Sequence, residues 1–204
     1  LDDPAAGDDA ATRSRFLGIM ATETNRMQAL VRDLMSLSRI EAEKYDPPQT
    51  PVDFASIIME TVDHLRNSQK DRGADIAVDV TSDLPPVMGD VGQLRQLASN
   101  ILNNSMKYGH AGTPVSVSLT PSKSGAMINF AVTDVGDGIA PEHLPRLTER
   151  FYRVDSGRSR LVGGTGLGLS LVKHIVDRHR GHLEIRSILG KGTTVSILLP
   201  VAHS

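Results

Sequence analysis

The sequence contains no cysteine and no tryptophan, and aromatic residues make up only 3% of its 204 residues. The absence of cysteine excludes disulfides and thiolate metal sites, which fits a reducing compartment such as the cytoplasm. The 22 basic and 24 acidic residues leave no basic excess, so the chain has no electrostatic footprint for nucleic acid. No apolar run is long enough to span a bilayer. A chain of 204 residues is expected to form one or two domains with a buried core.

The first fifth of the sequence has the apolar spacing of one long helix, from Thr12 to about Glu43. The apolar positions recur mostly at intervals of three or four residues: Phe16, Met20, Met27, Leu30, Leu34 and Leu37. A lone helix cannot bury such a stripe, so it needs partners from this chain or another. An ordinary bundle helix and a dimerisation helix are both compatible with this pattern.

A proline-rich segment then interrupts the helical pattern and predicts a stiff linker at residues 46–52. The chain is therefore divided into a helical part, residues 1–45, and a second domain, residues 53–204. In the second domain helical and strand patterns are interspersed, and consecutive strands are joined by short turns. This order favours an α/β (α+β) sandwich, in which one mixed sheet carries helices on one face.

The segment QLASNILNNSMKYG predicts a helix with a polar stripe beside its apolar face. At 100° per residue, the stripe contains Asn100, Asn104, Lys107 and Tyr108. A single asparagine there would simply face solvent, but two amides and an amine together are equally compatible with a binding site. Amide oxygens suit a hard cation such as Mg²⁺, and lysine suits phosphate.

The segment INFAVTDVGDGI predicts a strand that ends in an inward-facing carboxylate. Asp134 falls on the same side as the alternating apolar residues that precede it. A buried carboxylate needs a partner, and the exocyclic amine of a ligand would serve. Gly136 and Gly138 leave room for close approach to the backbone. The alternative is an aspartate that only caps a turn at the strand end.

The segment VGGTGLGLSLVKHI places Gly164, Gly166 and Gly168 directly before a predicted helix. Free N–H groups and the dipole make a helix N-terminus an anion site. The segment lacks the preceding strand of a dinucleotide fingerprint, and the GKGTT segment nearby lacks the P-loop spacing.

Five segments together resemble the N, G1, F, G2 and G3 boxes of sensor histidine kinases. In chain order they are NILNNSMKYG, DVGDGI, RFYRVD, GGTGLGLSLV and GKGTT. The resemblance covers about residues 54–200 and extends to the wider ATPase class shared with gyrase and certain chaperones. The preceding helix resembles the second helix of a kinase dimerisation and phosphotransfer domain, and is most similar to that of phosphate-regulon-type sensors.

The resemblance implies ATP and Mg²⁺ as ligands and assigns catalysis to four residues. Asn104 would coordinate Mg²⁺ with support from Asn100, while Lys107 and Arg153 would contact phosphate. Asp134 would accept the adenine amino group. The remaining matching residues would line the nucleotide pocket or hinge its lid: Tyr108, Gly136, Gly138, Phe151, Gly164, Gly166, Leu167, Gly168, Gly190, Gly192 and Thr193.

The resemblance also requires a phosphoacceptor histidine followed by an acidic residue, with proline a few positions on. None of the seven histidines has that context: His64, His110, His143, His174, His179, His182 and His203. We therefore expect the acceptor on a helix outside this chain, and the chain to be a fragment. Asn100 stands where hydrolytic relatives carry a glutamate base, which disfavours a chaperone-like ATPase because an amide cannot deprotonate water.

These features predict the catalytic portion of a two-component kinase, which passes the ATP γ-phosphoryl to histidine and then to a response-regulator receiver domain. The expected assembly is a homodimer through the N-terminal helix, on the cytoplasmic side of a membrane-anchored parent protein. The alternative is a non-catalytic ATP-binding and dimerisation module.

Overall fold

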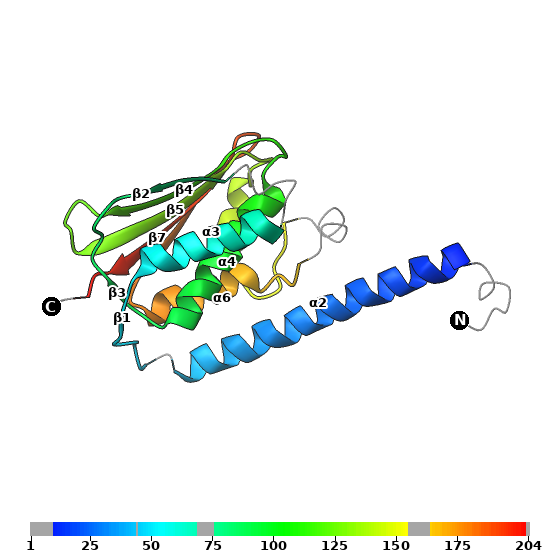
Figure 1. The fold of residues 1–204 in the computed structure, drawn as a ribbon, viewed down its shortest axis with the longest axis horizontal. Coiled ribbons are helices and arrows are strands. Elements are labelled where there is room, and N and C mark those ends of the chain that lie inside the picture. The colour runs from blue at the N-terminus through cyan, green and yellow to red at the C-terminus, as the bar shows by residue number, and fades with distance from the viewer. Residues whose placement is uncertain (1–9, 44, 69–75, 155–163, 203–204) are drawn as a thin grey trace.

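The computed structural model describes residues 10–43, 45–68, 76–154 and 164–202, and forms the predicted α/β sandwich. A five-stranded sheet carries helices on one face, and a long N-terminal helix lies beyond them (Figure 1). The elements are α2 (Ala10–Ala42), β1 (Pro51–Val52), α3 (Phe54–Ser68), β2 (Ile76–Val80), β3 (Val87–Met88), α4 (Val91–Tyr108), β4 (Val115–Pro121), β5 (Met127–Asp134), the 3₁₀ helix η2 (Pro141–Arg146), α6 (Gly168–Arg178), β6 (His182–Ile188) and β7 (Gly192–Pro200).

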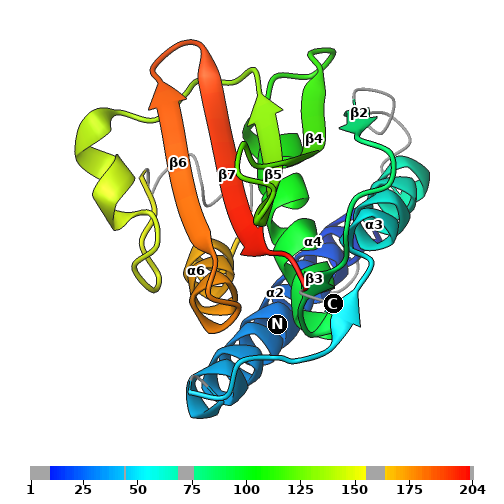
Figure 2. The ribbon, with the colours of Figure 1, turned by 90° about the vertical axis from the view of Figure 1, so that its left-hand side faces the viewer.

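The strand order is β2-β4-β5-β7-β6, with β2 parallel to β4 and the remaining pairs antiparallel. Figure 2 shows α3, α4 and α6 behind this sheet and η2 beside the edge strand β6. Alternation along β5 turns Ile128, Phe130 and Val132 toward the helices, where all three are buried. The ring of Phe130 meets that of Phe54 edge-on, with centroids 5.5 Å apart, so β5 and α3 share one core.

Helix α4 is fixed firmly at its N-terminus, which matters because it carries the polar stripe. The carboxylate of Asp90 caps the helix by accepting the Gln93 N–H at 2.9 Å. The Asp90 N–H in turn donates to Nε2 of His179 at 3.1 Å. His179 follows the last residue of α6 and is 2% exposed, so α4 and α6 are joined through a buried imidazole.

Two short strands were not anticipated from the sequence. The end of the predicted 46–52 linker forms β1, which pairs antiparallel with β3. A two-residue strand is too short to show alternation, so hydrophobic periodicity cannot predict it. The 3₁₀ helix η2 contains Pro145.

Helix α2 matches the predicted long helix, but most of its apolar stripe faces solvent. Phe16, Met20, Met27 and Leu34 are each at least 45% exposed, whereas Leu37 is 3% exposed. Among the described residues, the C-terminal part of α2 packs against the domain through the buried Leu37 and Ile40, and its N-terminal part extends past it (Figure 1). In the described part of the chain, no helix combines the length and hydrophobicity needed to cross a bilayer.

Candidate functional site

The polar stripe of α4 lies against the glycine-rich segment that opens α6. A Cβ added to Gly168 would lie 3.5 Å from Oδ1 of Asn100 and 4.0 Å from Nδ2 of Asn104. A Cβ added to Gly164 would lie 2.7 Å from Nζ of Lys107. The structure therefore brings the two amides and the amine to one helix N-terminus, where N–H groups and the dipole favour an anion.

One polar atom in this cluster lacks a hydrogen-bond partner among the described residues. Nδ2 of Asn100 is buried and unsatisfied. An unpaired buried donor costs about 1–3 kcal/mol, and such groups are rare unless a ligand or water completes them. Oδ1 of the same side chain lies beside Gly168, at the start of α6. Tyr108, the last residue of α4, is half exposed at the rim, with its ring 5.0 Å from Nζ of Lys107.

The same cluster suits Mg²⁺ only together with a nucleotide. Within the described ranges, no group of three or more His, Asp or Glu side chains is placed to hold a metal ion. Mg²⁺ commonly takes one or two protein oxygens and completes its shell with phosphate and water. The amide oxygen of Asn104 would provide one such ligand, so the chemistry of the residues present fits the expected pairing of metal and nucleotide.

Residues 151–153 and 164–166 are tied together on either side of residues 155–163. The Phe151 N–H donates to the Gly166 carbonyl oxygen at 2.9 Å, and Nη1 of Arg153 donates to that of Gly164 at 2.9 Å. Gly166 has φ 73°, and an added Cβ would lie 2.9 Å from Cα of Phe151, so only glycine fits. The middle of the predicted lid lies outside the described residues. A contact of Arg153 with γ-phosphate stays a prediction.

Asp134 is the buried carboxylate that the strand pattern predicted, with 7% exposure. Its Oδ1 accepts the Thr193 N–H at 3.2 Å. Burial raises the pKa of Asp134, while hydrogen bonds from the Thr193 amide and the Ser105 side chain, and the nearby His110, oppose that rise. Ser105 was missed by the sequence analysis because it lies on the core side of α4, next to the polar stripe.

The glycines around Asp134 are required by the close approach of the chain's own backbone. A Cβ on Gly136 would lie 2.5 Å from the Tyr108 carbonyl oxygen, and Gly109 and Gly136 form a β-bridge. Gly138, at φ 67°, lies against the backbone of Ile188, and Gly192, at φ 127°, lies against the carbonyl of Asp134. These contacts draw α4, β5 and the β6–β7 turn together around the carboxylate. The predicted contacts of Gly136 and Gly138 with a base remain predictions.

Gly190, in the turn between β6 and β7, differs from these glycines because it has open space around it. It has φ 75°, an added Cβ would have no neighbour within 4 Å, and its N–H donates to the Asp137 carbonyl oxygen at 2.7 Å. Gly190 therefore shapes the turn that positions Thr193.

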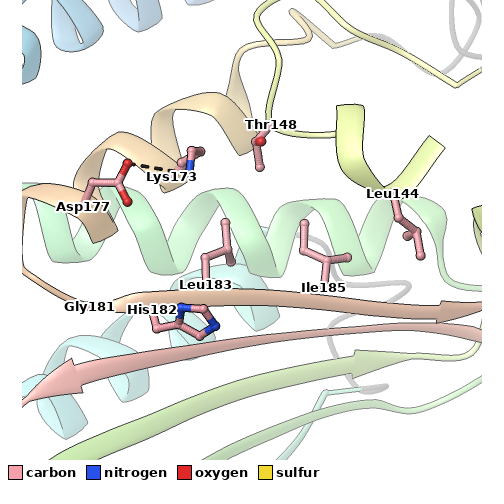
Figure 3. Close-up of a pocket in the computed structure, with 8 residues that line it drawn as sticks. All are labelled: Leu144, Thr148, Lys173, Asp177, Gly181, His182, Leu183 and Ile185. Atoms are coloured by element: carbon pink, nitrogen blue, oxygen red, sulfur yellow. Dashed lines mark ion pairs between the residues drawn. The ribbon is translucent and has the colours of Figure 1, made fainter. Parts of the chain in front are cut away.

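A separate groove of about 380 Å³ lies between η2, α6 and the edge strand β6 (Figure 3). Its lining residues are Leu144, Thr148, Lys173, Asp177, Gly181, His182, Leu183 and Ile185. None of them is a predicted site residue, and Lys173 is paired with Asp177 at 3.7 Å. This groove is therefore distinct from the polar cluster at the start of α6.

The model of the family described as "Histidine kinase-, DNA gyrase B-, and HSP90-like ATPase" matches residues 89–203. The chain is 38% identical over 203 residues to the sensor-like histidine kinase SenX3 of Mycolicibacterium smegmatis, covering 96% of this chain and 50% of that protein. It is 39% identical over 183 residues to the phosphate regulon sensor protein PhoR of Pseudomonas aeruginosa, covering 88% of this chain and 40% of PhoR. The chain thus spans half or less of the length of these two relatives.

Solved structures show the same fold. Full-length ShkA in complex with AMPPNP superposes with a TM-score of 0.76 at 27% identity, covering 96% of this chain and 40% of ShkA. The mycobacterial sensor histidine kinase MprB superposes with a TM-score of 0.63 at 30% identity, covering 76% of this chain and 99% of the MprB chain.

Proposed function

Since this chain belongs to the sensor histidine kinases and their wider family of histidine kinase-, DNA gyrase B- and HSP90-like ATPases, we propose that it binds Mg²⁺–ATP and donates the γ-phosphoryl to a histidine outside these 204 residues. From that histidine the phosphoryl group passes to a response-regulator receiver domain. The observation that carries the proposal is the meeting of Asn100, Asn104 and Lys107 with the N-terminus of α6.

The nucleotide would extend from a base end at Asp134 to a phosphate end at the α6 N-terminus. The carboxylate of Asp134 accepts a hydrogen bond from the exocyclic amine of adenine, beside the one it already accepts from Thr193. Helix α4 connects both ends because Ser105 touches Asp134 while Asn104, its neighbour, lies near Gly168. One rigid helix therefore sets the separation between the base and phosphate positions.

At the phosphate end the chain supplies charge and orientation. Lys107 places an ammonium group beside the loop at Gly164, and Asn104 would supply an amide oxygen for Mg²⁺. Mg²⁺ held there would neutralise phosphate charge, beside the ammonium group of Lys107. Asn100 orients groups through its unsatisfied Nδ2 and has no basic atom with which to activate water. The arrangement therefore favours transfer to a positioned imidazole over hydrolysis.

The partners follow from the same assignment. The exposed apolar residues of α2 are suited to pack in a homodimeric helical bundle, which would also position the acceptor histidine of a partner chain or of this protein's own upstream segment. We place the domain on the cytoplasmic side of a membrane-anchored parent protein.

Phosphoryl transfer can be tested with γ-labelled ATP and Mg²⁺. We expect no acid-labile, base-stable label on the 204-residue chain alone, and such a label on the longer polypeptide that includes the segment upstream of Leu1. Asn104→Ala in the longer polypeptide should reduce labelling about 100-fold through loss of a metal ligand. Asn103→Ala is the matched control, because Asn103 is exposed and its side chain donates to the Ser99 carbonyl.

Label on the 204-residue chain itself would reveal an acceptor histidine within it and contradict the assignment. ATP binding without label on either polypeptide would favour the alternative of a non-catalytic ATP-binding module.

A further inference from the structure

Helix α2 contacts the domain at the glycine-rich segment as well as at its own C-terminal end. Near that end, Glu41 pairs with Arg150, and Glu43 pairs with the buried Arg178 at 2.9 Å. About 12 Å back along the helix, at 1.5 Å per residue, the Thr165 hydroxyl donates to Oδ2 of Asp33 at 2.9 Å. This second contact joins residues 132 positions apart in sequence.

The Thr165 hydroxyl is at the same time the acceptor for a backbone amide. The Leu167 N–H donates to Oγ1 of Thr165 at 3.2 Å. A hydroxyl has one hydrogen, so donation to Asp33 directs that hydrogen away from Leu167 and leaves a lone pair facing the amide. Asp33, Thr165 and Leu167 therefore form a continuous chain of two hydrogen bonds.

The Leu167 amide is one of the N–H groups at the α6 N-terminus, where the proposed function places phosphate. Leu167 directly precedes the first residue of α6 and is its N-cap residue, whose own side chain makes no capping hydrogen bond. In the structure this N–H is occupied by the hydrogen bond to Thr165. A phosphate at the α6 N-terminus would have to compete with the Thr165 hydroxyl for this donor.

We propose that Asp33 is a positioning residue that couples the docking of α2 to nucleotide binding, by holding Thr165 against the Leu167 amide. Docking of α2 and binding of a nucleotide phosphate then oppose one another. Because such coupling is reciprocal, nucleotide binding weakens the hold of the domain on α2 to the same degree. The inference rests on the proposed ATP binding and adds to it a regulatory contact from the N-terminal helix.

The test is calorimetric titration of the purified chain with Mg²⁺ and AMPPNP, in the wild type and in four variants. Asp33→Ala removes the acceptor and Thr165→Val removes the hydroxyl at nearly constant shape. Each should tighten binding about tenfold, as expected for loss of one charge-assisted hydrogen bond. Alanine is a good helix former, so Asp33→Ala should not disturb α2.

Two further variants serve as controls. Thr165→Ser keeps the hydroxyl and should restore wild-type affinity, which a purely steric role of Thr165 would not require. Glu23→Ala removes a charge from the exposed part of α2, where Glu23 pairs only with Arg26 among the described residues, and should leave affinity unchanged. The double variant Asp33→Ala, Thr165→Val should bind no more tightly than either single variant, because both remove the same contact.

Unchanged or weaker binding of AMPPNP by Asp33→Ala would overturn the inference. Weaker binding by Thr165→Val would also overturn it, because that result would show that the hydroxyl contacts the nucleotide directly. Failure of the wild type to bind AMPPNP would instead reject the proposed function, and that result is visible before any variant is compared. Amide hydrogen exchange of the nucleotide-free chain gives a second readout. Exchange at Leu167 should be faster in Asp33→Ala than in Glu23→Ala, and equal rates would contradict the coupling.

Discussion

The domain around the sheet and the N-terminal part of α2 use similar apolar side chains in opposite ways. In the domain, Leu97 and Leu171 are fully buried between the helices and the sheet. In α2, Met27 is 66% exposed and Phe16 is 51% exposed, although both belong to a regular apolar stripe. The difference shows that a periodic pattern predicts a helix or strand and its apolar face. It does not predict which segment or chain packs against that face.

The largest expected effect separates the two regions directly. Leu97→Ala should lower the free energy of unfolding of the domain by about 3 kcal/mol, since it leaves a cavity in a packed core. Met27→Ala should change it by less than about 0.5 kcal/mol, because the Met27 side chain is mostly exposed. Urea denaturation followed by circular dichroism at low protein concentration measures both. Equal losses would contradict the contrast between the two regions.

A smaller effect should depend on pH and arise within the domain. Burial lowers the pKa of His179, while its hydrogen bond with the Ile175 carbonyl raises it less. Neutral Nε2 accepts the Asp90 N–H, and a protonated ring cannot. Below about pH 6.5 the unfolded chain therefore binds a proton more readily than the folded one. The stability contributed by His179 is complete above that pH and is lost as the pH falls toward the folded-state pKa.

His179→Gln tests this directly, because the glutamine amide neither titrates nor loses the ability to accept a hydrogen bond. The variant should flatten the dependence of unfolding free energy on pH between about 5 and 7. His64→Gln, at an exposed position on α3, is the matched control for the same substitution outside the buried contact. A pH profile of His179→Gln that matches the wild type would contradict the claim that protonation of His179 lowers the stability of the domain.

Much of the fold follows from local patterns. Alternation predicted β5 with Asp134 facing inward, and helical periodicity predicted the polar stripe of α4 beside a core face. The strands β1 and β3 were not predictable because two residues carry no period. The ends of the elements were located approximately, as expected where capping contacts such as that of Asp90 decide the boundary.

The candidate site was only partly visible in the sequence. Glycine patterns indicated the loop before α6, but not that Gly136 and Gly192 accommodate the chain's own backbone. The contact of Ser105 with Asp134 could not be predicted, because Ser105 belongs to the core face of α4 rather than to the polar stripe. The contact between Asp33 and Thr165 has no local signature, since it depends on how α2 lies against the domain. Long-range polar contacts of this kind become visible only in three dimensions.

The central claim is that the α4 face and Asp134 form one nucleotide site, and calorimetric titration with Mg²⁺ and ATP tests it most directly. The wild type should bind, and Asp134→Asn should lose detectable binding, a loss of about 100-fold or more for a buried charged hydrogen-bond acceptor. Asp79→Asn, on the exposed side of β2, should bind like the wild type. Unchanged ATP affinity in Asp134→Asn would contradict the account.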